Sequence, residues 1–263
     1  TAASEMIEDF TSFQIDSLLE SIDASQNRRG EGAADPVDAD LEFARGIVWK
    51  WRDNPARAIV HLDAAIEIDP TLLAAYRARA EVRLARNNLS GANEDLTRVL
   101  EVQPEASDAR RLRITARERL GARGGAIDDL SVLLRETDQA AEARELIERR
   151  LDLQVELARW EGALDALDLL IEGGSLEPPV VAAPVRIASS RGNVELFRKR
   201  AEAHLALADW ERAIADLDFL IETETSRVPR ANAHKLRARA YLGLDDPQQA
   251  IEDAERSVGL NPN

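Results

Sequence analysis

Two stretches that nearly repeat each other decide the fold: "DNPARAIVHLDAAIEIDP" at residues 53–70 and "NNLSGANEDLTRVLEVQP" at residues 87–104. Each has a small residue near its middle, a large apolar residue four positions later and a proline at its end. The alanines Ala58, Ala92 and Ala126 follow one another at intervals of 34 residues. A fixed period of this length predicts a stack of copies of one structural unit.

The residues of the first unit predict two helices that pack against each other. "LEFARGIVWKW" contains Gly46, which permits close approach of two helices, and Trp49, which supplies bulk. "NP" then turns the chain. The second helix has an apolar stripe at helical spacing, formed by Ala58, Leu62, Ala65 and Ile66. Neither helix buries this stripe alone, so pairing is expected.

Five further units follow the same scheme. The marker residues of the second unit are Tyr76, Ala80, Ala92, Leu96, Val99 and Pro104, and those of the third are Ile114, Ala126, Leu130, Leu133 and Asp138. The fourth unit has Trp160, Ala163, Leu167 and Leu170. The fifth has Phe197, Ala201, Trp210, Ala213, Leu217 and Leu220, and the sixth has Ala238, Tyr241, Ala250, Ala254 and Pro262. The fourth unit is extended, because Ala163 comes 37 residues after Ala126. Ile114 at a close-approach position predicts looser packing in the third unit.

These markers resemble the tetratricopeptide repeat, with its pattern W-x2-L-G-x2-Y, then A-x3-F, then P. The resemblance covers residues 39–262 apart from an insertion. It implies an all-α fold, a right-handed α-solenoid of about six stacked helix-turn-helix repeats with an extra N-terminal helix. It also implies that the first helices line a concave groove that binds extended or helical peptides.

Four segments are expected along the chain. They are an N-terminal amphipathic helix and linker at 1–38, repeats 1–4 at 39–172, a Pro-containing insertion at 173–193 and repeats 5–6 at 194–263. Pro36 suits the first turn of a helix. For the insertion, a strap packed on the solenoid and a partner-binding loop both stay open.

The N-terminal segment has apolar residues at helical spacing among acids, including Phe10 and Leu18. An apolar stripe on the first helix of unit one, formed by Phe43, Ile47 and Trp51, needs a cover. The segment is expected to cover it, either as a permanent cap or as an occupant that a partner displaces. A pocket for a peptide side chain is the alternative.

The resemblance places candidate partner-binding residues on the first helices. They are Phe43, Ile47, Trp51, Arg77, Glu81, Arg111, Thr115, Arg149, Asp152, Arg198, Glu202, Lys235 and Arg239. The simpler interpretation of each charge is a solvated helix face with i,i+4 pairs. Some family members hold the C-terminal carboxylate of heat-shock chaperones with Lys, Asn and Arg. The matching positions here are Phe43, Ile47, Ala78, Asp108 and Leu112, so binding of that kind is not expected.

Charge argues against a nucleic-acid partner. The formal net charge is −15, and residues 1–40 contribute ten acids against two arginines, so −8 lies there and −7 in the rest. Binding of nucleic acid needs clustered positive charge instead. No stretch is long and apolar enough to insert directly into a membrane. A soluble protein is expected.

Catalytic, metal and cofactor sites are not expected. The chain has no cysteine. His204 and His234 fall at tyrosine and tryptophan positions of the repeat and are interpreted as packing residues, while His61 lies on a second helix. No metal-binding histidine spacing, phosphate-binding loop or nucleophile motif is present. Adjacent acids such as Asp128 and Asp129 are interpreted as solvated.

The sequence therefore predicts a non-catalytic scaffold or adaptor that binds a protein or peptide. One alternative is a self-assembling element, because Ile251, Ala254 and Val258 on the last helix lack an evident cover. An adequate cap by that helix, or a truncated chain, would account for the same feature. Another alternative is the targeting module of a larger enzyme. Basic residues are nearly all arginine, which is typical of GC-rich bacteria, so a bacterial cytoplasm or periplasm is expected.

Overall fold

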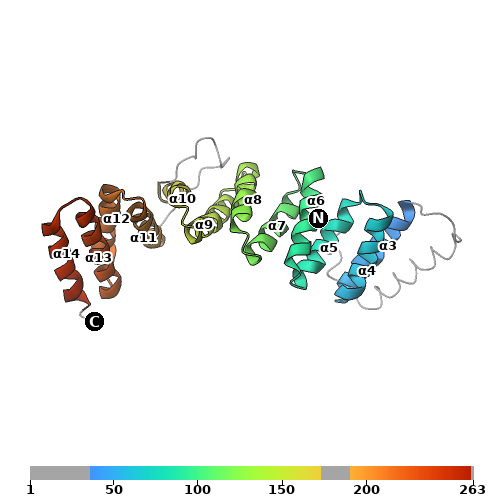
Figure 1. Cartoon of the computed structure of the whole chain (residues 1–263), viewed down its shortest axis with the longest axis horizontal. Helices are drawn as coiled ribbons and strands as arrows, with labels where there is room; N and C mark the ends of the chain where they lie inside the picture. Colours follow the sequence, from blue (N-terminus) through green and yellow to red (C-terminus); the bar gives the residue numbers. More distant parts are fainter. Residues whose placement is uncertain (1–35, 173–189, 262–263) are drawn as a thin grey trace. The chain divides into compact units, whose positions relative to one another are not determined.

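The structure is a computed structural model that describes residues 36–172 and 190–261. In these residues the chain forms twelve α-helices and no β-strand (Figure 1), which confirms the predicted all-α fold. The helices are α3 (Pro36–Trp51), α4 (Pro55–Ile68), α5 (Leu73–Ala85), α6 (Leu89–Val102), α7 (Ser107–Arg119), α8 (Arg123–Glu136), α9 (Ala140–Glu156), α10 (Trp160–Glu172), α11 (Ser190–Ala206), α12 (Trp210–Thr223), α13 (Arg227–Gly243) and α14 (Pro247–Leu260).

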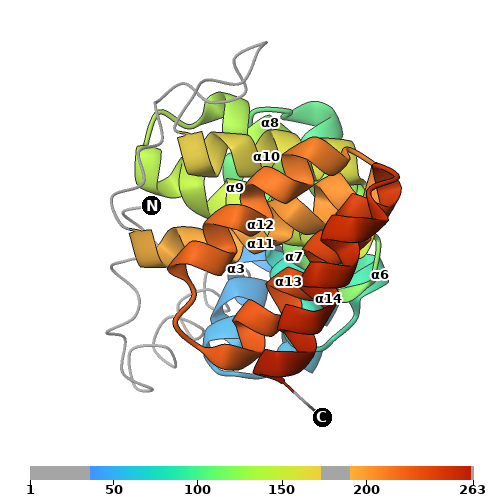
Figure 2. The ribbon, with the colours of Figure 1, turned by 90° about the vertical axis from the view of Figure 1, so that its left-hand side faces the viewer.

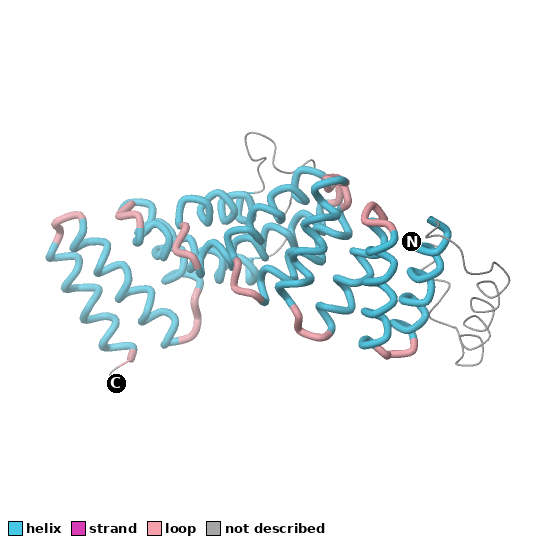
Figure 3. Tube along the Cα trace, turned by 45° about the vertical axis from the view of Figure 1, so that its right-hand side comes forward, coloured by secondary structure: helices cyan, strands magenta, loops and turns pink. Residues whose placement is uncertain are grey.

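Successive helices are joined by short turns, as Figure 3 shows, except between α10 and α11, where residues 173–189 lie outside the described residues. The chain divides into two compact parts, unit 1 up to Ala126 and unit 2 from Ile127. In unit 1, α3 packs on α4 and α5 on α6; in unit 2, α9 packs on α10, α11 on α12 and α13 on α14. Within unit 2, α12, α13 and α14 also lie side by side (Figure 2). Two parts of the predicted segments lie outside the described residues. They are residues 1–35 of the N-terminal segment and residues 173–189 of the insertion.

Turn chemistry explains where each pair reverses. The second residue after α3, α5, α7, α9, α11 and α13 adopts positive φ, at Asp53, Asn87, Gly121, Ala158, Ala208 and Asp245. A left-handed residue ends a helix by letting its N–H group bond back to the last turn. The next residue often caps the second helix: the side chain of Asn54 accepts a bond from the Arg57 amide, and Asp246 does the same for Gln249.

Alanine and leucine build the core of each pair. In α4 the fully buried residues are Ala58, Leu62 and Ala65, and they pack with Ala75, Ala78 and Val82 of α5. Equivalent leucines, Leu96 in α6 and Leu217 in α12, are also fully buried. Ile114 has no exposed surface either. The predicted stripe therefore forms the helix–helix interface in both units.

Gly46 lies at the predicted point of close approach. A Cβ atom on it would lie 2.6 Å from Cγ of Leu62 and 3.3 Å from the carbonyl oxygen of Ala58. These separations leave no room for a side chain, because carbon atoms in contact prefer about 3.5–4.0 Å. Glycine is therefore required here so that α3 and α4 can pack.

Several acids of the second helices are buried, which corrects the interpretation of adjacent acids as solvated. Asp129 is 2% exposed although its neighbour Asp128 is exposed. The reason is visible in other pairs. Arg200 of α11 binds both carboxylate oxygens of Asp216 in α12, at 2.9 and 2.7 Å, and also Asp168 of α10 at 2.9 Å. The arginine thus links two successive second helices.

The same arrangement recurs twice. Arg79 of α5 joins Asp95 of α6 to Asp63 of α4, and Arg237 of α13 joins Asp253 of α14 to Asp218 of α12. Although burial alone would lower it, the pKa of Arg79 is raised by its hydrogen bonds to Asp95 and Asp63. Each arginine therefore stays charged, and bidentate pairing offsets the cost of burying the charges.

Candidate functional site

The apolar residues predicted to line the groove in unit 1 are half-buried and contact the core. Phe43 and Ile47 pack against the cluster that contains Leu62. Trp51 packs against Val48 on the same helix. The segment that was expected to cover these residues lies outside the described residues.

Charged first-helix residues of unit 1 form a chain of ion pairs. Lys50 of α3 binds Glu81 of α5. Arg77 of α5 lies 3.9 Å from Glu81 and 4.0 Å from Asp108 of α7. Three successive first helices are linked in this way. Exposed ion pairs of this kind contribute little to stability, on the order of 0–1 kcal/mol each.

The remaining charged or polar candidates of unit 1 are Arg111 and Thr115 of α7. Arg111 is exposed, and Thr115 donates a hydrogen bond to the Arg111 carbonyl oxygen at 3.2 Å. An open hollow of about 400 Å³ lies beside Arg77, Val99 and Gln103. Its walls come from the α4–α5 turn, α5, the end of α6 and the α6–α7 turn.

In unit 2, the candidate residues differ in exposure and in the side chains that they contact. Asp152 of α9 pairs with Lys199 of α11 at 2.7 Å. Arg149 is half-buried and Arg239 is exposed. Arg198, Glu202 and Lys235, however, come together around one pocket.

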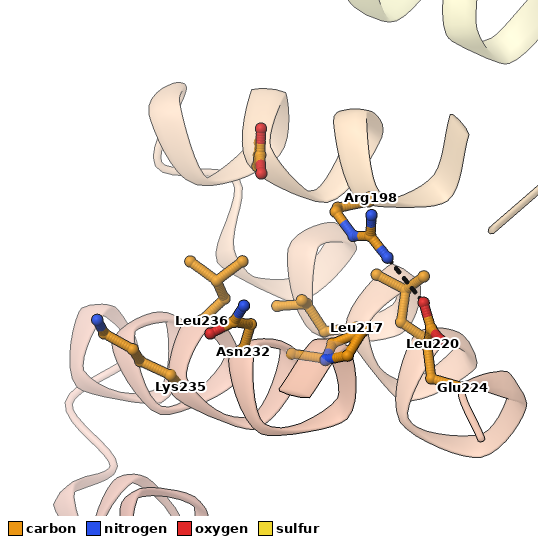
Figure 4. A pocket seen from close by; sticks show the side chains of 10 residues that line it. Arg198, Leu217, Leu220, Glu224, Asn232, Lys235 and Leu236 are labelled. Carbon is orange, nitrogen blue, oxygen red and sulfur yellow. Dashed lines mark hydrogen bonds and ion pairs between the residues drawn. The ribbon is translucent and has the colours of Figure 1, made fainter. Parts of the chain in front are cut away.

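This pocket has a volume of about 300 Å³ and lies among α11, α12 and α13 (Figure 4). Apolar residues supply its floor and polar residues its rim. The complete lining is Arg198, Glu202, Leu217, Leu220, Glu224, Pro229, Asn232, Ala233, Lys235 and Leu236. The volume is at the lower end of the range for small-ligand sites.

Helix length explains why the pocket forms here. The first helices α11 and α13 of unit 2 have 17 residues, whereas α5 and α7 of unit 1 have 13. The extra turn of α13 begins at Arg227 and contributes Pro229 to the wall. Proline is tolerated there because the first turn of a helix needs no N–H donor. The longer helices therefore raise the walls of the pocket.

One end of the rim is closed by an ion pair. Arg198 donates to Glu224 at 2.7 Å, as Figure 4 shows, and to Glu195 at 2.5 Å. Among residues 36–172 and 190–261, by contrast, Glu202, Asn232 and Lys235 form no hydrogen bond or ion pair. Lys235 and Asn232 project from α13 on the side of the pocket opposite Arg198 (Figure 4).

The environment of Glu202 disfavours its negative charge. Desolvation at the pocket wall raises the pKa of Glu202, and the Glu195 carboxylate adds to this effect. Arg198 and Lys199 act in the opposite sense but do not outweigh it. A positive or N–H donor group in the pocket would therefore be stabilised by Glu202.

Sequence reasoning missed Asn232, Leu236, Pro229 and Glu224. The first three lie on α13, which begins at Arg227, and all of them precede Ala238, the first marker residue of the sixth unit. The stretch "SRVP" at residues 226–229 carried the signal, because a serine followed by proline within the first turn is typical of a helix start. Glu224 is the last residue before a turn, where no periodicity marks it.

The histidines do not meet at a common site. His204 and His234 are both buried, in agreement with their interpretation as packing residues, and His234 bonds Asp253 at 2.9 Å. His61 bonds Glu42 at 2.7 Å. Within the described ranges, no group of three or more His, Cys, Asp or Glu side chains is placed to hold a metal ion. No described helix is both long enough and apolar enough to cross a membrane.

A search of solved structures finds a match over most of the chain. A tetratricopeptide repeat protein from Parabacteroides merdae matches with a TM-score of 0.50 and 18% identity, over 94% of this chain and 87% of that one. The chain has the tetratricopeptide repeat fold. At this identity the likeness concerns the fold alone. No protein-family model matches the sequence, and no curated protein matches it.

Other structures match less closely. PilF of Pseudomonas aeruginosa is 16% identical with a TM-score of 0.40, over 86% of this chain and 93% of that one. A complex of the yeast Sti1 TPR2AB domain with an Hsp90 peptide is 18% identical with a TM-score of 0.37, over 85% and 90%. At these TM-scores neither contributes to the argument.

In terms of the tetratricopeptide repeat, the pocket lies between the first helices of repeats five and six, with the second helix of repeat five at its base. Three of the thirteen candidate groove residues line it, namely Arg198, Glu202 and Lys235. Arg77 lines the more open hollow in unit 1. The other nine candidates line neither of these two hollows.

Proposed function

We propose that this tetratricopeptide repeat chain is a non-catalytic scaffold that binds a peptide or protein partner, and that the α11–α13 pocket is the main contact. The observation that carries the proposal is the composition of this pocket. Its floor is apolar and its rim holds three polar side chains with no partner among the described residues. Binding sites combine an apolar lining with a few polar groups in this manner.

The pocket belongs to helices that are held firmly. Arg200 and Arg237 tie α11 and α13 to their neighbours through bidentate bonds to Asp216 and Asp253. Phe197 of α11 stacks on Phe219 of α12 with ring centroids 4.1 Å apart. A partner therefore meets a site that is already formed, which lowers the entropic cost of binding.

A peptide-display library tests this proposal. Peptides selected on the natural chain should bind the Asn232→Arg variant about tenfold more weakly or worse, because the long side chain would occupy the pocket mouth. Asn232 is exposed, so the fold should tolerate the change. Gln248→Arg is the matched control, since Gln248 is exposed on α14 and does not line the pocket. Selected peptides that bind all three proteins equally would contradict the proposal.

A second candidate function, self-association, is favoured by the outer face of α14. Ile251 is 60% and Val258 63% exposed, and Ala254 between them is exposed too. The equivalent residues of α12, namely Ile214, Leu217 and Ile221, pack in the cluster that includes α13. α14 thus presents the kind of surface on which another helix packs inside the array.

Molar mass in solution tests self-association. The chain should exceed its monomer mass of 29.1 kDa in light scattering at micromolar concentration. Replacing Ile251 and Val258 by Asp should then restore the monomer, whereas Val60→Asp should not, because Val60 is equally exposed but lies on α4. A monomeric natural chain would rule out this candidate.

A further inference from the structure

We propose that the α11–α13 pocket recognises an extended peptide segment in which one apolar residue is flanked by side chains of opposite charge. The inference rests on the proposed peptide-binding function and names the chemistry of the ligand. Its basis is the position of two unpaired, oppositely charged side chains on different walls of one pocket. Glu202 belongs to α11 and Lys235 to α13.

The other two charges of the lining neutralise each other. Arg198 and Glu224 form an ion pair at 2.7 Å, and Glu195 adds a second carboxylate to the same guanidinium group. Arg198 is thereby held away from a ligand. Glu202 and Lys235 are left, and each lacks a hydrogen bond or ion pair within the described chain. Both side chains are exposed, so the pocket offers an accessible acidic group on one wall and an accessible basic group on the other.

The two charges occupy separate walls. Glu202 comes four residues after Arg198, which places both on the same face of α11. Lys235 lies on α13 across the pocket from Arg198, with Asn232 one turn earlier on the same helix (Figure 4). A ligand between the walls meets an acceptor on the α11 side and donors on the α13 side.

The floor between these walls takes an apolar group. Leu217, Leu220 and Leu236 line it, and Leu236 is the one that keeps substantial accessible surface. A volume of about 300 Å³ suits one aliphatic side chain and its adjoining backbone. Three extended residues span about 10 Å, enough to place one charged side chain on each side of the apolar residue.

Rim charges of this kind select the order of residues in a ligand more than they raise affinity. A basic residue should sit beside Glu202 and an acidic residue beside Lys235. In a peptide bound in the same chain direction, reversing the two charges would bring like charges together at both walls. Binding should therefore depend on the order of the charged residues at constant composition.

Two capped fluorescent pentapeptides test this, Gly-Lys-Leu-Glu-Gly and Gly-Glu-Leu-Lys-Gly, with dissociation constants measured by anisotropy and by NMR titration up to millimolar concentration. The natural chain should bind one order about fivefold or more tightly than the other, since charged hydrogen bonds are worth that much or more. The double variant Glu202→Lys with Lys235→Glu should prefer the opposite order.

The matched control is Glu67→Lys with Arg86→Glu, two exposed residues of unit 1 outside the pocket. It makes the same exchange of charge and should keep the order preference of the natural chain. Circular dichroism should show that both double variants are folded.

Equal affinity for the two orders, an unchanged preference in the Glu202/Lys235 variant, or binding of neither peptide overturns the inference. The proposed function is judged separately. If library-selected peptides still lose affinity on Asn232→Arg, the pocket binds peptides but does not select charge order. If no library peptide depends on the pocket, both proposals fail.

Discussion

At the scale of single residues, close contacts and buried charges set the stability of the molecule. Gly46 was predictable from the sequence, because a glycine at a repeated small-residue position indicates close approach. The burial of Asp129 and Asp216 was not, because a carboxylate next to other charges in the sequence is normally solvated. For Asp216, Arg200 of α11 reverses that expectation by binding both carboxylate oxygens.

Replacing Gly46 by Ala should destabilise the chain by about 1–2 kcal/mol. Overpacking against Leu62 costs about 1–3 kcal/mol, and the better helix propensity of alanine returns less than about 1 kcal/mol. Urea unfolding would measure the difference. Gly259→Ala is the control, because nothing lies within 4 Å of a Cβ atom there. Equal stability of the two variants would mean that α3 and α4 move apart easily.

His204 should make stability depend on pH. Desolvation by burial lowers the pKa of His204 from its usual 6.5; Asp216, Asp209 and Asp168 oppose the shift and Arg200 adds to it. The Nδ1 atom has no hydrogen-bond partner among the described residues and lies 3.5 Å from Oδ2 of Asp209. The folded chain therefore holds this histidine neutral at pH values where the unfolded chain protonates it.

The sign of the effect follows from linkage. The stability associated with neutral His204 is fully present above pH 6.5 and is lost as the pH falls from there through the lowered pKa, by at most about 1.4 kcal/mol per pH unit. Urea midpoints at pH 7.5 and 5.5 should therefore differ less in His204→Phe than in the natural chain. The same loss in both proteins would exclude His204 as the cause; His61→Phe controls for removal of a histidine.

At the scale of elements, the turns inside the helix pairs contain strained residues whose replacement should raise the stability of the folded chain. Six residues adopt positive φ at equivalent places, and two of them are alanines, Ala158 and Ala208. An L-residue with a Cβ atom has a steric cost in this conformation, on the order of 1 kcal/mol, that glycine avoids. Gly121 shows the solution in the third pair.

Ala208→Gly should raise stability by a few tenths to about 1 kcal/mol, because the relief of strain exceeds the added entropy of the unfolded chain. The reverse exchange, Gly121→Ala, should lower it by a similar amount. Thermal unfolding monitored by circular dichroism would measure both. Ala206→Gly is the control: it lies in helix α11, where glycine should destabilise. A loss of stability in Ala208→Gly would contradict the strain argument.

The helices themselves were largely predictable from periodicity, whereas their lengths were not. The helix α13 begins at Arg227, well before Ala238, the first marker residue of the sixth unit, and Pro229 and Asn232 of the pocket lie in this early part of the helix. Helix ends are the least certain part of a sequence pattern because apolar spacing fades outside the packed core. The candidate site was accordingly predicted only in part.

At the scale of the whole molecule, a repeat array should lose stability in increments. Deleting residues 227–263 removes the α13–α14 pair and leaves the α12 face that contacts α13 uncovered. The shortened chain should still fold, with a denaturant m-value lower by roughly one sixth and a lower Tm, because m scales with the surface exposed on unfolding. Complete loss of helical circular dichroism on this deletion would show that the array folds as one cooperative block.

The sequence by itself determined the repeat architecture of this protein. The small residues at close contacts and the leucine stripe are encoded within a single helix pair, and the 34-residue period follows from comparing successive pairs, so sequence spacing suffices to predict them. The tertiary structure decided which charges are buried and where the pocket lies. Arg200 finds its partners 16 and 32 residues away, and the pocket needs three helices at once. Such groups meet only when the repeats stack, and no local pattern records which of them will be paired and which left open.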